Sequence, residues 1–242
     1  MRHAQSIRLQ RDKAGMMSAR KRIWGWFFFD WASQPYNTLL VTFIFAPYIK
    51  EIIGDGAVAQ STWGFTVGAA GICIALMAPI LGAVADIYGN RMRWIWVFSV
   101  LYVAGAAGLW LAVPVDYPLT LVLLSFAGGL IGMEFATIFT NSMLPDLGTR
   151  QEIGRISGKG WAFGYAGGLI GLFILLLLFV EQSSGKTLIG LDPAFGLNAE
   201  AREGTRFVGP FTAIWFALFT IPYFLWVKDT GAQMAGNARQ AL

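Results

Sequence analysis

The sequence predicts an all-α membrane protein, and three observations support this. Hydrophobic residues make up 56% of the 242 residues, and charged residues make up only 13%, whereas a soluble domain carries roughly 25% charged residues. The mean hydropathy is +0.56. Six apolar segments reach the length of about 20 residues that a helix needs to cross a bilayer. We therefore expect six transmembrane helices packed into one bundle.

The six predicted spans divide the chain into a bundle and two polar ends. The spans are Ile23–Ile49, Trp63–Ile87, Trp94–Val113, Pro118–Met143, Trp161–Val180 and Phe207–Val227. The first span is too long for the core of a signal peptide and lacks a cleavage site of small residues, so it is expected to be retained. This gives a basic tail at 1–22, a transmembrane bundle at 23–227 and a second tail at 228–242.

Lysine and arginine residues predict the orientation. Fourteen lie on the side of the two termini and four on the other side, so the positive-inside rule places both termini in the cytoplasm. Seven of the fourteen are in the first tail: Arg2, Arg8, Arg11, Lys13, Arg20, Lys21 and Arg22. We interpret this tail as an orientation signal, with specific recognition of lipid headgroups as the alternative.

The composition also bears on the class of function. Cys73 is the single cysteine and His3 the single histidine, so disulfides and histidine-based metal sites are not expected. The cations sit at the membrane edges, which argues against nucleic acid as a partner. We find no combination of nucleophile, base and orienting group, so we expect no enzyme, no catalytic residues and no cofactor.

Span one carries a polar stripe within apolar surroundings. Residues at helical positions i, i+3, i+4, i+7 and i+8 share one face, and this set is Asp30, Ser33, Gln34, Asn37 and Thr38. An acid inside a span is by default a functional hypothesis, because burying it in hydrocarbon is costly. Pro35 lacks an N–H and frees the carbonyl of Trp31 as a ligand contact or a hinge. The alternative is that the stripe only hydrogen-bonds to neighbouring helices.

Span four contains the other intramembrane acid. Glu134 shares a face with Thr137 and Asn141, so the two spans could line one water-filled cavity. Two neighbouring carboxyl groups are a common basis for binding and releasing a proton. We therefore assign proton or cation coupling to Asp30 and Glu134, although Glu134 could instead pair with Arg155 or Lys159.

Glycines recur at helical spacing in two spans. In span five, one row holds Gly160, Gly164 and Gly168, and a second row holds Gly167 and Gly171. Gly64 and Gly68 have the same spacing in span two. Small residues at this spacing let helix backbones approach closely. We expect tight packing here, with sliding of these faces during a conformational cycle as a further possibility.

The loop after span two reads "GAVADIYGNRMR" and is similar to the cytoplasmic signature of the major facilitator superfamily. The matching residues are Gly82, Asp86, Gly89 and Arg91, and the resemblance implies that they belong to a cytoplasmic gate. Asp86 could cap the next helix or pair with a cation. Ile87 and Asn90 depart from the pattern, which is usually basic at both positions.

Three further motifs narrow the resemblance. They are "DWASQPY" (30–36), "NSMLPDL" (141–147) and "GRISGKGWAFGYAGG" (154–168). Together they look like the branch of autophagy-related vacuolar amino-acid effluxers and their bacterial relatives. The resemblance implies the N-terminal half of a twelve-helix transporter, with spans one and four lining the cavity.

These observations give one expected function and one alternative. We expect a secondary transporter in the cytoplasmic membrane that moves a small polar solute, such as an amino acid, by alternating access. A second six-helix bundle, either a twin chain or a separate C-terminal half, is the expected partner. The alternative is a membrane scaffold or assembly subunit that does not transport.

Overall fold

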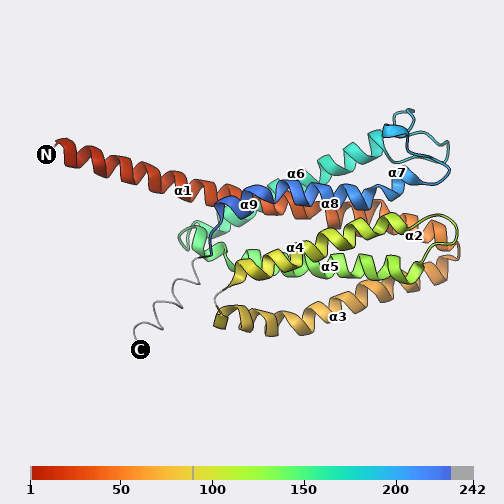
Figure 1. Ribbon diagram of the computed structural model, residues 1–242, viewed down its shortest axis with the longest axis horizontal. Coiled ribbons are helices and arrows are strands. Elements are labelled where there is room, and N and C mark those ends of the chain that lie inside the picture. The colour runs from red at the N-terminus through yellow and green to blue at the C-terminus, as the bar shows by residue number, and fades with distance from the viewer. Residues whose placement is uncertain (1, 89, 230–242) are drawn as a thin grey trace.

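The computed structural model describes residues 2–88 and 90–229, with side chains for 18–85 and 90–229. All regular structure in this part of the chain is helical (Figure 1). The elements in order are α1 (Arg2–Pro35), the π-helix η1 (Tyr36–Phe43), α2 (Phe45–Ile53), α3 (Gly56–Tyr88), α4 (Arg91–Gly108), η2 (Leu109–Leu111), α5 (Leu119–Ser142), η3 (Leu144–Leu147), α6 (Ile153–Leu178), η4 (Ala194–Gly196), α7 (Glu203–Arg206), α8 (Val208–Phe219) and α9 (Ile221–Trp226).

Five of the six predicted spans are helices long and apolar enough to cross a membrane. They are Gly56–Ala85, Arg91–Leu111, Leu119–Ser142, Ile153–Leu178 and Glu203–Trp226. The remaining span, Ile23–Ile49, is divided among α1, η1 and α2, which follow one another along the bundle (Figure 1). The change of winding follows directly after Pro35, which has no N–H to donate to the α-helical ladder.

Two helices begin earlier than the hydropathy pattern predicts. α3 starts at Gly56 and not at Trp63, because Asp55 Oδ1 caps it by accepting from Ala57 N at 2.9 Å and Val58 N at 3.0 Å. α6 starts at Ile153 and not at Trp161. Its first two turns include exposed cations and so extend beyond the apolar part of the span.

The bundle is built around span one. In Figure 1, α1 runs beside α6, α8 and α9, while α4 and α5 lie together and α3 occupies the outer edge next to α5. The backbones of α4 and α5 approach so closely that a Cβ on Gly105 would lie 2.4 Å from Gly129 N. Tyr36 joins the two groups of helices, since its hydroxyl donates to Phe126 O at 2.6 Å. The buried centre is thus aromatic and nearly free of charge.

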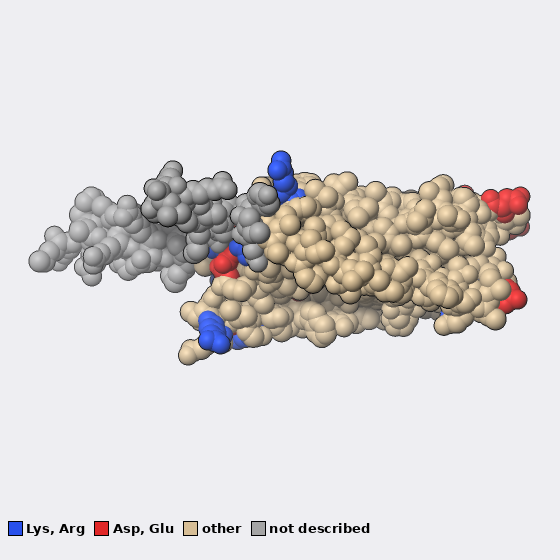
Figure 2. Space-filling view, turned by 90° about the horizontal axis from the view of Figure 1, so that it is seen from below, with Lys and Arg blue, Asp and Glu red and all other residues tan. Residues whose placement is uncertain are grey.

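Charged side chains gather at the two ends of the molecule. Figure 2 shows a broad uncharged band between them, as expected for a protein surrounded by lipid. At the end away from the termini, the segment after α6 folds over α2. Glu181 is 3% exposed there and accepts from Thr205 Oγ1 at 2.6 Å, and Arg202 pairs with Glu51 at 2.7 Å. The hydrogen bond from Thr205, together with Arg202 Nε at 3.4 Å from Glu181 Oε1, compensates the cost of burying the Glu181 carboxylate.

Candidate functional site

A polar cavity of about 230 Å³ lies between α1, α5 and α6. Its lining comes from all three helices and from the start of η1: Asp30, Ser33, Gln34, Asn37, Met133, Glu134, Thr137, Trp161, Gly164 and Tyr165. The structure therefore brings together six of the eight polar side chains that the sequence assigns to coupling or to solute contact. The cavity follows from helical periodicity, because each of the two stripes occupies one face of its helix.

The other two predicted cavity residues lie elsewhere. Thr38 is 8% exposed and faces α6, where a Cβ on Gly168 would lie 2.5 Å from Thr38 Oγ1. Asn141 is exposed near the end of α5 and does not line the cavity. Trp161 and Tyr165 line it without having been predicted. Their aromatic side chains could not be told from lipid-facing residues by sequence pattern.

The two acids have no cationic partner in the described part of the chain. Asp30 Oδ2 is buried there without a hydrogen bond, and Ser33 Oγ donates to the backbone oxygen of Asp30 at 3.3 Å, not to its carboxyl group. Among these residues, no ion pair joins Glu134 to Arg155 or Lys159. Arg155 instead lies 3.8 Å from Glu152. Both carboxyl groups are thus available to an occupant of the cavity.

The amide and hydroxyl groups in the cavity have only weak protein partners. Asn37 Nδ2 and Thr137 Oγ1 each lie 3.9 Å from the Met133 sulfur, which is a weak acceptor. These donors can exchange the sulfur for a better acceptor on a solute without breaking a strong bond. The cavity therefore offers two carboxyl groups together with neutral donors and acceptors. In the described residues, no cluster of three or more side chains could hold a metal ion.

Glycines on α6 form the wall next to Asp30. A Cβ on Gly164 would lie 3.1 Å from Asp30 O, and one on Gly160 would lie 2.2 Å from the Trp26 ring and 3.1 Å from Asp30 Oδ2. Gly168 likewise faces Gln34 and Thr38. The row that the sequence singled out therefore brings α6 against α1 along the cavity. Any side chain at these positions would push the two helices apart.

The carbonyl freed by Pro35 is used within the fold. Trp31 O accepts a hydrogen bond from Trp215 Nε1 at 3.1 Å, and the two indole rings stack at 5.8 Å. The predicted ligand contact at this carbonyl is therefore occupied by α8. What the sequence analysis did not predict is that Tyr36–Phe43 winds as a π-helix, a form that is frequent at functional sites.

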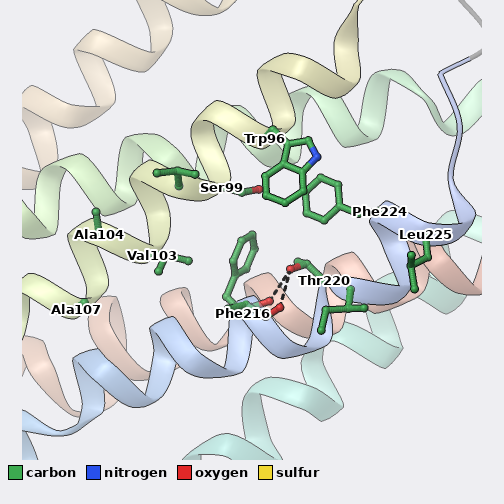
Figure 3. A pocket seen from close by; sticks show the side chains of 12 residues that line it. Trp96, Ser99, Val103, Ala104, Ala107, Phe216, Thr220, Phe224 and Leu225 are labelled. Carbon is green, nitrogen blue, oxygen red and sulfur yellow. Dashed lines mark hydrogen bonds between the residues drawn. The ribbon is translucent and has the colours of Figure 1, made fainter.

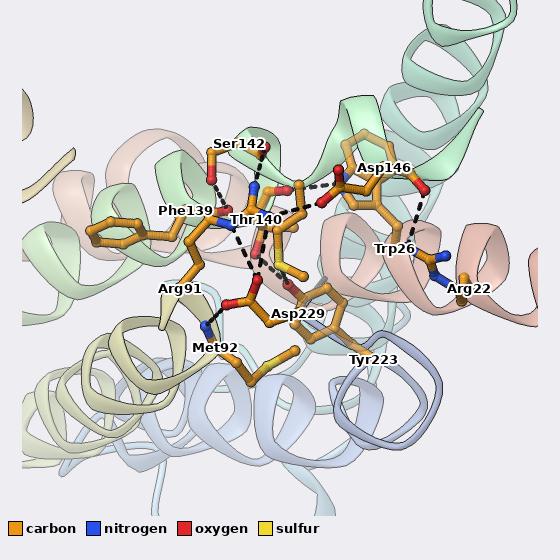
Figure 4. Close-up of polar contacts among 11 residues, drawn as sticks. Arg22, Trp26, Arg91, Met92, Phe139, Thr140, Ser142, Asp146, Tyr223 and Asp229 are labelled. Atoms are coloured by element: carbon orange, nitrogen blue, oxygen red, sulfur yellow. Dashed lines mark hydrogen bonds and ion pairs between the residues drawn. The ribbon is translucent and has the colours of Figure 1, made fainter. Parts of the chain in front are cut away.

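A second polar cluster closes the end of the bundle that carries the termini (Figure 4). Arg91 lies 2.8 Å from Asp146 Oδ2 and 3.3 Å from Asp229 Oδ1, and it donates to Ser142 O at 2.8 Å. Arg22 donates to Asp146 O at 3.0 Å. These contacts tie α1 at Arg22 to the start of α4, the end of α5, η3 and the segment after α9. The sequence predicts a gate role for Arg91 but not for the two aspartates, because only the fold brings residues 91, 146 and 229 together.

Glu152 lies next to this cluster, just before α6. Its carboxylate accepts from Thr149 Oγ1 at 2.8 Å and from Thr149 N at 3.1 Å. These two hydrogen bonds, the hydroxyl first, lower the pKa of Glu152 below its usual value. The loop between η3 and α6 is therefore held in place by a charged acceptor at neutral pH.

The other predicted gate residues are Gly82, Asp86 and Gly89. A Cβ on Gly82 would meet nothing within 4 Å. Gly89 and the side chain of Asp86 lie outside the described residues. The cap of α4 is provided by Asn90, whose side chain accepts from Arg93 N at 3.3 Å. The departure from the family pattern at Asn90 thus has a structural role.

A larger groove of about 560 Å³ lies between α4 and α8/α9 (Figure 3). Apart from the hydroxyls of Ser99 and Thr220, its lining is apolar, with Trp96, Phe216 and Phe224 among the aromatic residues. Thr220 Oγ1 donates to Phe216 O at 2.7 Å. These two hydroxyls are too few to compensate the desolvation of a polar solute, so the groove is not a second solute site.

Comparison with known proteins identifies the family. Residues 58–240 match the family model described as vacuole effluxer Atg22 like. The chain therefore belongs to the Atg22-like family, and its predicted resemblance to this branch of the major facilitator superfamily is confirmed, as is the all-α membrane fold. The matched residues include Glu134, Arg91, Asp146 and Asp229, but not Asp30 or Arg22.

A curated relative is the uncharacterized MFS-type transporter YxiO of Bacillus subtilis. It is 28% identical to this chain over 201 residues, which cover 81% of this chain and 44% of the relative. The chain thus spans about half the length of this relative. No solved structure matches the chain.

Proposed function

We propose that the chain is the N-terminal half of a major facilitator transporter that moves a small polar solute, of the amino-acid class, by alternating access. The observation that carries this proposal is the polar cavity of about 230 Å³ inside an otherwise apolar bundle. Its lining combines two carboxyl groups with amide and hydroxyl groups, which favours a polar solute. The family description as vacuole effluxer is the reason for testing efflux first.

In this proposal, Asp30 and Glu134 couple transport to a proton or another cation. Each lines the cavity, and neither is paired with a cation in the described part of the chain. A solute ammonium group or a proton would supply the missing positive charge, and Gln34, Asn37 and Thr137 would complement the other polar atoms. Acids in this position within a membrane are typical of proton relays and ion pathways.

A second six-helix bundle completes the proposed transporter. The cavity is flanked by aromatic residues that this chain leaves open, since Trp161 is 64% exposed and Tyr165 is 46% exposed. Polar groups facing lipid without partners would be costly. A partner bundle, from a twin chain or a separate C-terminal half, would cover this side and still admit water.

The exposed surface of α3 favours the same partner. Only 6% of its most apolar stretch is buried, against 33–44% for the other four spans. Tight packing was expected at Gly64 and Gly68, yet a Cβ on either would meet nothing within 4 Å in the described residues. Small residues left open in this way suit close approach by another helix. If particles with the mass of a single chain transported the solute actively, the proposal of a functional unit with two bundles would be contradicted.

The transport proposal can be tested in cells that export labelled amino acids. Asp30→Asn and Glu134→Gln should each lower proton-dependent efflux at least about tenfold, as expected when a group essential for proton transfer is lost. Membrane insertion should persist, because an amide is easier to place in lipid than a carboxylate. Glu200→Gln, which changes an exposed acid after α6, is the matched control. Unchanged coupled efflux in both cavity variants would leave the acids with a structural role only.

A further inference from the structure

A groove of about 490 Å³ lies beside span one at the end that carries the termini. Arg20, Lys21, Trp24 and Phe28 line it from α1, and Trp226 lines it from the end of α9. We propose that this groove binds one anionic phospholipid, with the phosphate at Arg20 and Lys21 and an acyl chain along the aromatic side chains. The site is distinct from the solute cavity and does not depend on transport.

Close packing of α1 against α9 forms the groove. A Cβ on Gly25 would lie 3.0 Å from Val227 Cγ2 and 3.2 Å from Pro222 O. Only a residue without a side chain lets the two helices approach this closely. As a result, the Trp226 ring lies 6.4 Å from the Phe28 ring, and the two side chains form one continuous surface.

The two cations at the groove differ from Arg91 and Arg22, which have protein partners at the same end of the molecule. Arg91 is held between two aspartates, and Arg22 donates to Asp146 O. Arg20 and Lys21 are exposed, and among the described residues neither makes a hydrogen bond or an ion pair. No side chain in the described ranges therefore compensates their charge. A phosphate diester in the headgroup layer is the complementary group that a membrane supplies at this depth.

The aromatic residues continue the groove toward the hydrocarbon. Trp24 is 42% exposed, and its ring lies 6.5 Å from Phe28 and 5.8 Å from Phe163 on α6. Tryptophan is enriched at the membrane interface because its ring is apolar and its N–H is polar. One turn of helix separates the cations from Trp24 and a second separates Trp24 from Phe28. This order, charge first and then aromatic surface, matches a phospholipid from headgroup to chain.

Native mass spectrometry in mild detergent tests the proposal on the full chain. With phosphatidylglycerol and phosphatidylcholine present together, we expect one retained phosphatidylglycerol, preferred about tenfold, in keeping with two juxtamembrane cations. Arg20→Gln/Lys21→Gln should abolish the preference. Arg20→Lys/Lys21→Arg should keep it, which separates loss of charge from loss of folding.

The matched control removes two other cations on the same side. Arg150→Gln/Lys159→Gln changes the net charge equally, and both residues are exposed. It should leave the preference intact. Equal loss in both double variants would mean general attraction to a basic surface and would overturn the site. Inorganic phosphate that displaces the lipid fully at millimolar concentration would also overturn it, because the aromatic groove would then contribute nothing.

Discussion

At the scale of single residues, Asp30 is placed by close packing of helix backbones and not by an ion pair. Asp30 lies against the bare backbone of α6 at Gly160 and Gly164. Helical periodicity in the sequence was sufficient to predict that Asp30 and Glu134 share a cavity. Periodicity was not sufficient to predict the cavity wall that α6 contributes, since Trp161 and Tyr165 follow the same pattern as lipid-facing aromatic residues.

Water access to the cavity can be tested at Asn37. In a Cys73→Ser background, Asn37→Cys should react with a small water-soluble thiol reagent, because Asn37 lines the cavity and is partly exposed. Leu39→Cys is the control two residues further on, where the side chain is fully buried. Protection of Asn37→Cys at a high concentration of the transported solute would link the cavity to binding. Equal reactivity at both positions would mean that η1 unwinds, and a cavity at Asn37 would no longer explain the labelling.

Arg91 should contribute measurably to stability. Its side chain is 14% exposed and lies 2.8 Å from Asp146 Oδ2 and 3.3 Å from Asp229 Oδ1, so Arg91→Met removes both of these contacts together with the hydrogen bond to Ser142 O. We expect a loss of about 2–3 kcal/mol, below the range for fully buried pairs because Asp146 is 29% exposed. Unfolding in detergent measures this, with Arg93→Met as an exposed control. A loss no greater than that of the control would show that the cluster is not stabilising.

At the scale of helices, the contact between α6 and α1 allows the most direct test of close backbone packing. Gly160→Ala places a methyl group 2.2 Å from the Trp26 ring, so the helices must separate. We expect destabilisation of about 1–3 kcal/mol, as for other overpacked sites. Gly158→Ala, half a turn earlier, meets nothing within 4 Å and should be neutral or slightly stabilising. Equal effects of the two substitutions on thermal unfolding would contradict close contact at Gly160.

The helices also show what hydropathy can and cannot predict. Spans are predictable because a lipid environment forces every backbone N–H and C=O into an internal hydrogen bond. The ends of the helices are not predictable from hydropathy, since the Asp55 cap of α3 and the exposed first turns of α6 lie outside the apolar stretches. Pro35 predicts a break in the α-helical ladder but not the π-helical winding of Tyr36–Phe43 that follows it. The hydrogen bonds that hold this part of span one, from Trp215 to Trp31 O and from Tyr36 to Phe126 O, join residues far apart in the chain.

At the scale of the whole molecule, the distribution of cations predicts the orientation in the membrane. Ser183→Cys, after α6, and Gln151→Cys, before it, are both exposed positions. In a Cys73→Ser background, a membrane-impermeant reagent should label intact cells only at Ser183→Cys, because fourteen of eighteen cations lie on the other side. Gln151→Cys should become reactive once the cells are opened. Labelling of Gln151→Cys in intact cells would reverse the topology.

The length of α3 has a consequence for the surrounding bilayer. Its uncharged stretch, Gly56–Ala85, has 30 residues and is about 45 Å long, whereas the 21 residues of Arg91–Leu111 measure about 32 Å. A hydrocarbon core is only about 30 Å thick. Where α3 faces lipid and not the partner bundle, it must therefore tilt, or the membrane must thicken around it. Such hydrophobic mismatch falls on α3 more than on the shorter helices behind it, so a thinner host membrane would make α3 lean further against α5, within the limits set by its packing.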